Sequence, residues 1–191
     1  MKKSIDTSLL DRAIIFAVHA HQGVARKGKG FPYIVHPLEA MSIVATMTND
    51  QELLAAAVLH DVIEDAGVSV DELRREFGER VAMLVEAESD IKVEGLKEDS
   101  WLLRKQTALD RLTSASREVK IVTLGDKLSN MRAIAHDYAV VGDELWNRFS
   151  VKDPHRHAWR YKALVNVLSD LSDTDAYQEF QMLVNQVFAG L

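Results

Sequence analysis

The chain has 191 residues, 47% of them hydrophobic, and no cysteine, which excludes disulfides, thiolate metal sites and cysteine nucleophiles. Its 29 acidic and 23 basic residues give a formal net charge of −6, which argues against binding to DNA or RNA backbones. This length suits a single domain over residues 1–191, and the composition is that of an ordinary globular protein.

Helical periodicity recurs along the chain, and alternating strand patterns of any length are missing, which predicts an all-α fold. Pro37 suits the first turn of the second helix. Ser69 and Glu72 have the form of a capping box, and Gly78 is expected to end or bend the helix that follows. Helices are predicted over residues 6–23, 36–44, 53–65, 69–78, 81–88, 100–113, 119–136, 154–171 and 175–188.

Two other features of the chain complete this outline. Residues 91–99 form the least regular segment, which we interpret as a loop whose role the sequence leaves open. No apolar run approaches the roughly 20 residues needed to cross a bilayer, so we expect no membrane partner and, by default, a cytoplasmic location.

The predicted helix over residues 53–65 is the most informative segment. Its first seven residues carry no charge and should be buried, whereas four ionisable side chains follow: His60, Asp61, Glu64 and Asp65. At about 100° per residue these four fall within an arc of roughly 140° and converge on one side of the helix. Unpaired buried charges cost several kcal/mol each, so a compensating metal ion is the natural candidate.

Ligands for such an ion recur in two other segments. His36 opens one predicted helix, and Asp126 lies in another, with Asn130 four residues later on the same face. With His60 and Asp61, the chain thus offers two imidazoles and two carboxylates for one divalent ion, with coordination positions left for water and substrate. This mixed nitrogen and oxygen ligation is compatible with Mn²⁺, Fe²⁺, Mg²⁺ and Zn²⁺.

Four ordered motifs give the chain a wider resemblance. They read AHQGVARK (residues 20–27), PYIVHP (32–37), LHDVIED (59–65) and GDKLSNMR (125–132). In this order they resemble the HD-domain alarmone hydrolases, the hydrolase half of the RelA/SpoT proteins and their small stand-alone relatives. The resemblance implies an HD-domain helical bundle with a central metal site. Because no synthetase region would fit in the chain, we expect a stand-alone hydrolase.

The resemblance also implies the reaction and the residues that perform it. The reaction is removal of pyrophosphate from the 3′ position of guanosine tetra- or pentaphosphate, which yields GDP or GTP. The implied ligands of the cation, usually Mn²⁺, are His36, His60, Asp61 and Asp126. The implied catalytic acids are Glu64 and Asp65. The implied nucleotide contacts are Arg26, Lys27, Asn130 and Tyr161.

The loop over residues 26–33 departs from the family's pattern. It is one residue longer than the usual Arg-Lys-Ser-Gly-Glu-Pro-Tyr and lacks its acidic side chain, so guanine specificity stays open. Two other functions therefore remain in competition. One is hydrolysis of another nucleotide, such as an adenosine alarmone, a nucleoside monophosphate or NADPH; the other is nucleotide binding without turnover. The sequence does not choose between a monomer and a homodimer.

Overall fold

The computed structural model describes residues 5–89 and 97–191, with the backbone alone for residues 97–100. Within these ranges the elements are helices, and an isolated bridge joins Ala25 to Pro32, so the all-α prediction is confirmed. None of the described helices is both long and apolar enough to span a bilayer. The helices are α1 (Ser8–Ala20), α2 (Val35–Val44), α3 (Gln51–Leu59), α4 (Val62–Ala66), α5 (Val70–Phe77), α6 (Glu79–Glu88), α7 (Lys97–Thr113), α8 (Arg117–Val141), η1 (Gly142–Arg148), α9 (Pro154–Val167), η2 (Ser169–Leu171) and α10 (Asp175–Val187).

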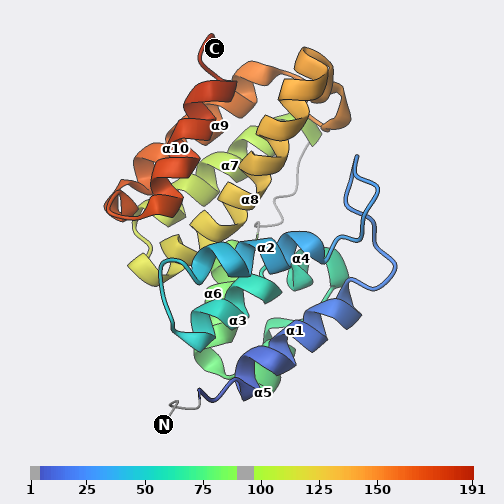
Figure 1. The fold of residues 1–191 in the computed structure, drawn as a ribbon, viewed down its shortest axis with the longest axis vertical. Coiled ribbons are helices and arrows are strands. Elements are labelled where there is room, and N and C mark those ends of the chain that lie inside the picture. The colour runs from blue at the N-terminus through green and yellow to red at the C-terminus, as the bar shows by residue number, and fades with distance from the viewer. Residues whose placement is uncertain (1–4, 90–96) are drawn as a thin grey trace.

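The long helix α8 connects the two halves of the fold (Figure 1). It contacts α2, α3 and α6 from the N-terminal half and α10 from the C-terminal half. Twelve of its residues are buried, among them Asp126 and Ser129, because helices cover it on several sides. The helix α3 is similarly enclosed, and its apolar residues from Leu53 to Leu59 join the core. Polar groups carried by α3 and α8 are therefore brought together in the interior.

Local sequence signals fix several helix ends. The Ser69 hydroxyl accepts a hydrogen bond from the Glu72 backbone N–H at 3.1 Å, and α5 ends before Gly78, as the sequence predicts. Gly78 has a φ of +90°, which favours glycine. The prediction of a loop over residues 91–99 falls mainly on residues 91–96, which lie outside the described residues, whereas residues 97–99 belong to α7.

The prediction of one continuous helix over residues 53–65 is wrong. The chain leaves α3 after Leu59 and begins α4 at Val62. Asp61, with φ −98° and ψ −1°, lies in the sparsely populated bridge region, where active-site residues are often found. The break places His60 and Asp61 at a junction between helices, so the two side chains meet each other instead of projecting at regular helical angles.

Gly125 allows α2 and α8 to approach closely. A Cβ atom at this position would lie 2.6 Å from Val44 Cγ2 and 2.8 Å from the Ala40 carbonyl oxygen. We expect Gly125→Ala to lower the free energy of unfolding by about 1–3 kcal/mol, because the backbone of α2 must move. Helix propensity alone predicts the opposite sign, a gain of about 1 kcal/mol. Urea unfolding measures the difference.

A second variant measures the contribution of helix propensity to stability without a change in helix packing. Ala139 is exposed on the same helix, and Ala139→Gly should cost about 1 kcal/mol from propensity alone. A Gly125→Ala protein that is about 1 kcal/mol more stable than the parent, the gain expected from propensity alone, would show that α2 and α8 are not in contact there.

Candidate metal centre

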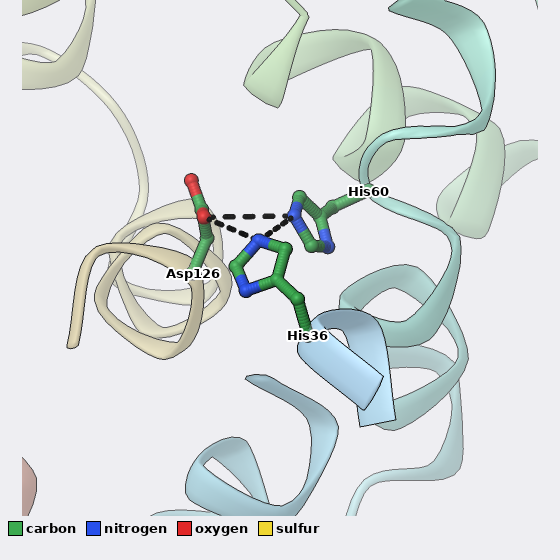
Figure 2. A group of neighbouring side chains, drawn as sticks. All are labelled: His36, His60 and Asp126. Atoms are coloured by element: carbon green, nitrogen blue, oxygen red, sulfur yellow. Dashed lines mark hydrogen bonds and ion pairs between the residues drawn. The ribbon is translucent and has the colours of Figure 1, made fainter. Parts of the chain in front are cut away.

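Three buried side chains from three helical segments converge at one point (Figure 2). His36 comes from α2, His60 follows the end of α3, and Asp126 comes from α8. The Nε2 atoms of the two histidines lie 3.2 Å apart, and Asp126 Oδ1 lies 3.1 Å from His36 Nε2 and 3.6 Å from His60 Nε2. The three residues are 4%, 2% and 5% exposed, so water does not compensate them fully. The three segments that the sequence predicts to meet thus lie together in the structure.

Asp61 adds a second carboxylate to this cluster. Its Oδ2 atom lies 2.8 Å from His60 Nε2 and 3.5 Å from His36 Nε2. The Tyr33 hydroxyl donates a hydrogen bond to the same oxygen at 2.5 Å, which orients the carboxylate. Two nitrogens and a carboxylate oxygen each about 2.1 Å from one ion can be at most about 4.2 Å apart. The distances between the imidazoles and both carboxylates, 2.8 to 3.6 Å, satisfy this limit.

The outer nitrogens of both imidazoles are anchored. His60 Nδ1 donates to the Ala57 carbonyl at 2.8 Å, and His36 Nδ1 donates to Ser129 Oγ at 2.7 Å. Ser129 in turn donates to Glu39 Oε2 at 2.7 Å, which fixes the direction of the chain of hydrogen bonds. These bonds hold the Nδ1 protons outside and turn both Nε2 atoms inward. Imidazoles that ligate metals typically donate the outer N–H to a neighbouring protein group in this way, so the residues fit a divalent cation.

Electrostatics favour a positive charge between the carboxylates. Burial opposes ionisation of Asp126, but the Lys127 ammonium and the two imidazoles hold the pKa of Asp126 well below its usual value. Burial likewise opposes protonation of His60, but Asp61 and Asp126 outweigh it and raise the pKa of His60 well above its usual value. A divalent cation would displace the proton that these carboxylates attract to His60.

The hydrogen bond from His36 to Ser129 predicts a measurable effect on metal binding. Ser129→Ala removes the acceptor of His36 Nδ1–H, so the affinity for Mn²⁺ should fall about 10- to 100-fold. Calorimetric titration of metal-free protein measures this affinity. Ser42→Ala is the matched control, because its hydroxyl donates to the Leu38 carbonyl on α2, away from the cluster. Equal Mn²⁺ affinity in both variants would rule out the supporting role of Ser129.

A cavity opens beside the cluster, and we call it the metal cavity. Its wall contains His36, His60, Asp61 and Asp126, together with the proposed catalytic residue Glu64. Both members of the acidic pair are exposed, but Asp65 does not belong to this wall. The structure thus separates two carboxylates to which the sequence assigns a joint role.

The substrate contacts expected from the sequence also border cavities. Arg26 and Asn130 lie in the wall of the metal cavity, where Arg26 Nη2 donates to Asn130 Oδ1 at 2.6 Å. Asn130 Nδ2 donates to Asp126, so these residues form a chain that ends on a metal ligand. Lys27 and Tyr161 border an adjoining space, the lateral cavity, which also includes Arg26 and Asn130.

Sequence reasoning gave no site role to several residues of the metal cavity. The Lys127 ammonium bonds Asp126 and lies 4.0 Å from Glu88 Oε2. Burial raises the pKa of Glu88, although Lys127 offsets part of this effect. Tyr33 and Lys127 occur within the motifs that carry the resemblance, so their positions offered a signal. Glu88 and Arg160, which lie outside the motifs, offered none.

Comparisons with known proteins agree with this architecture. A 36% identical relative from Aquifex aeolicus, named guanosine-3′,5′-bis(diphosphate) 3′-pyrophosphohydrolase, aligns with 65% of this chain and 18% of its own length. A Synechocystis relative named probable guanosine-3′,5′-bis(diphosphate) 3′-pyrophosphohydrolase is 31% identical over 92% of this chain and 24% of its own length. The chain therefore spans about a fifth of the length of the curated relatives it matches.

Solved structures share the fold. A metazoan ortholog of SpoT, described as hydrolysing ppGpp, superposes with a TM-score of 0.74 over 98% of this chain and 97% of its own, at 23% identity. A Listeria monocytogenes protein superposes with a TM-score of 0.72, also at 23% identity, over 81% of this chain and 99% of its own. The HD domain family matches residues 13–152, which include all four expected metal ligands. The chain belongs to the HD domain family.

Proposed function

We propose that this protein is a metal-dependent hydrolase that removes pyrophosphate from the 3′ position of guanosine tetra- or pentaphosphate. Water is consumed, and the products are pyrophosphate and GDP or GTP with a free 3′ hydroxyl. The observation that carries this proposal is the convergence of His36, His60 and Asp126 beside a cavity with basic residues in its wall. The names of the relatives supply the substrate class. A guanine nucleotide substrate of this kind favours the cytoplasm as the place of action.

The proposed ligands of the cation are His36, His60, Asp61 and Asp126, and we propose Mn²⁺ as the ion. Two imidazoles and two carboxylates suit Mn²⁺ without excluding other divalent metals. When bound, a divalent cation lowers the pKa of coordinated water toward about 7 and polarises a phosphate oxygen. This chemistry needs no serine or cysteine nucleophile. We also propose that residues 1–191 act as a single domain, since α8 contacts helices from both halves.

Glu64 and Asp65 are the proposed proton-transfer residues. Glu64 borders the metal cavity, where its carboxylate can accept a proton from the attacking water. Asp65 lies outside the wall of this cavity, and we propose that it acts at longer range by its charge. The Lys127 ammonium, on the same wall, is placed to stabilise negative charge on the phosphate as the bond breaks.

The lateral cavity is the proposed site for the nucleoside. Its wall combines the aromatic rings of Tyr33, Phe149 and Tyr161 with the polar groups of Arg26 and Asn130. Aromatic rings stack on bases, and a guanidinium binds phosphate or stacks on a base. Because Arg26 and Asn130 border both cavities, a nucleotide held here extends to the metal ligands. Lys27, which is exposed at the rim, adds positive charge.

Replacement of Arg26 tests the substrate contacts. Arg26→Ala should raise KM for guanosine tetraphosphate about 10- to 100-fold, because a charge-assisted hydrogen bond to phosphate is lost. The change in kcat should be smaller, since no metal ligand is removed. Steady-state kinetics measure both constants. Arg26→Lys keeps the charge and isolates the contribution of the planar guanidinium. An unchanged KM in Arg26→Ala would exclude Arg26 from the binding site.

One assay separates the proposed reaction from the alternatives. Metal-replete protein is incubated with guanosine tetraphosphate, its adenosine counterpart, nucleoside monophosphates and NADPH, and the products are identified. GDP and pyrophosphate from guanosine tetraphosphate are the expected products. Preferential turnover of the adenosine compound, or release of inorganic phosphate from a monophosphate or from NADPH, would instead assign another nucleotide substrate. Binding without turnover would indicate a regulator.

A further inference from the structure

Arg160 occupies a junction between three cavities. It lies on α9 and is half-buried. It borders both the metal cavity and the lateral cavity. It also borders a third space, the α7 cavity, which lies between α6, α7, α8 and α9 and has Leu109, Leu112 and Leu164 in its wall. A group bound to Arg160 would therefore lie close to the metal ligands without occupying their place.

Among the described side chains, those of residues 5–89 and 101–191, no carboxylate pairs with the guanidinium of Arg160. Its described contact is with the ring of Tyr161, whose centroid lies 6.0 Å from Arg160 Cζ. Two other half-buried arginines differ: Arg80 pairs with three carboxylates, and Arg132 pairs with two. A half-buried cation without an anion is costly, and guanidinium groups in that position commonly bind phosphates.

The neighbouring cations are already engaged. Lys127 bonds Asp126, and Arg26 bonds Asn130. On the lateral cavity wall, Lys29 pairs with Asp137, as does Arg148. Of the three cations that border both the metal cavity and the lateral cavity, Arg26, Lys127 and Arg160, only Arg160 makes no hydrogen bond or ion pair with the described side chains.

The proposed substrate carries two diphosphates, and only one can lie at the cation during hydrolysis. We infer that Arg160 binds the other one, the 5′-diphosphate that is not cleaved, and thereby makes the enzyme selective for nucleotides with anionic groups at both ends. This inference rests on the proposed function. Arg160 would then be a specificity residue, because it holds a part of the substrate that does not react.

The experiment compares the effect of one substitution at Arg160 on the hydrolysis of two substrates. The catalytic efficiency, kcat/KM, is measured for the parent and for Arg160→Gln with guanosine 3′,5′-bis(diphosphate) and with guanosine 3′-diphosphate, which has a 5′ hydroxyl. Arg160→Gln should lower kcat/KM about 10- to 100-fold for the first compound, mainly through KM, and less than about threefold for the second. Arg160→Lys should recover part of the loss. Lys162→Gln, an exposed charge removal on the same helix, should have little effect.

Each remaining result has a definite meaning. Equal losses with both compounds would place Arg160 at the cleaved group or in the fold, and the inference would be wrong. No loss with either compound would also overturn it. If the parent protein hydrolyses neither compound, the proposed function fails separately. Calorimetric affinities of the two compounds for parent and Arg160→Gln then test the inference, which requires a loss confined to the compound with the 5′-diphosphate.

Discussion

Replacement of His60 by alanine should abolish both metal binding and turnover. His60 is 2% exposed, and its Nε2 atom lies within 3.6 Å of His36, Asp61 and Asp126, so its loss removes a central ligand. Activation of water and polarisation of phosphate by a metal supply several kcal/mol, and the expected fall in kcat/KM is about 10³-fold or more. Elemental analysis after dialysis measures bound metal, and pyrophosphate release measures turnover.

A matched variant controls for damage to the core. His157 is 5% exposed and hydrogen-bonds the Val151 carbonyl through Nε2, but it does not border the metal cavity. His157→Ala should lower the stability of the fold but keep one equivalent of bound metal. His60→Ala should lose the metal whether or not its stability is lowered. His60→Gln, which fills more of the space, covers the case in which the alanine variant fails to fold. Stoichiometric metal and parental turnover in either His60 variant would remove His60 from the site.

Replacement of Glu64 by glutamine should separate catalysis from metal binding. Glu64 borders the metal cavity but lies outside the group of convergent ligand atoms. The amide cannot accept the proton of the attacking water, so kcat should fall about 10²- to 10⁴-fold while the metal stays bound. Single-turnover kinetics with saturating guanosine tetraphosphate, together with metal analysis of the same sample, provide both readouts.

The neighbouring carboxylate provides the comparison for Glu64. Asp65→Asn changes the net charge by the same amount one residue away, on a side chain that does not border the cavity. We expect a loss in kcat of no more than about tenfold, since Asp65 takes no proton from the water and acts only by its charge, which solvent screens. A larger loss in Asp65→Asn than in Glu64→Gln would reverse the two roles. Loss of metal in Glu64→Gln would make Glu64 a ligand.

The segment around residues 53–65 shows what sequence patterns can and cannot predict. The uncharged run before His60 correctly indicates a buried helix, because burial of apolar side chains leaves a clear signal. The break at Asp61 leaves no such signal, since the same residues would also continue a helix without penalty from glycine or proline. The prediction that four side chains converge on one side of a helix is therefore wrong for Asp65. The prediction that His60 and Asp61 are metal ligands does not depend on a continuous helix.

Long-range contacts are the other limit of the sequence. The motifs indicated that His36, His60 and Asp126 belong together, and the structure brings them within 3.6 Å. The chain from His36 through Ser129 to Glu39 could not be predicted, because serine and glutamate on helices are usually explained by solvent exposure. The proposed role of Arg160 could not be predicted either. It depends on where α9 packs against the other helices, and the spacing of residues along the sequence does not indicate this.

The most direct test of this account is a crystal of the protein grown with Mn²⁺ and measured at the manganese absorption edge. The account predicts one strong anomalous peak within bonding distance of His36 Nε2, His60 Nε2 and a carboxylate oxygen of Asp126, and none in crystals of His60→Ala. A map with no peak at this position in the parent protein, even with excess Mn²⁺, would contradict it.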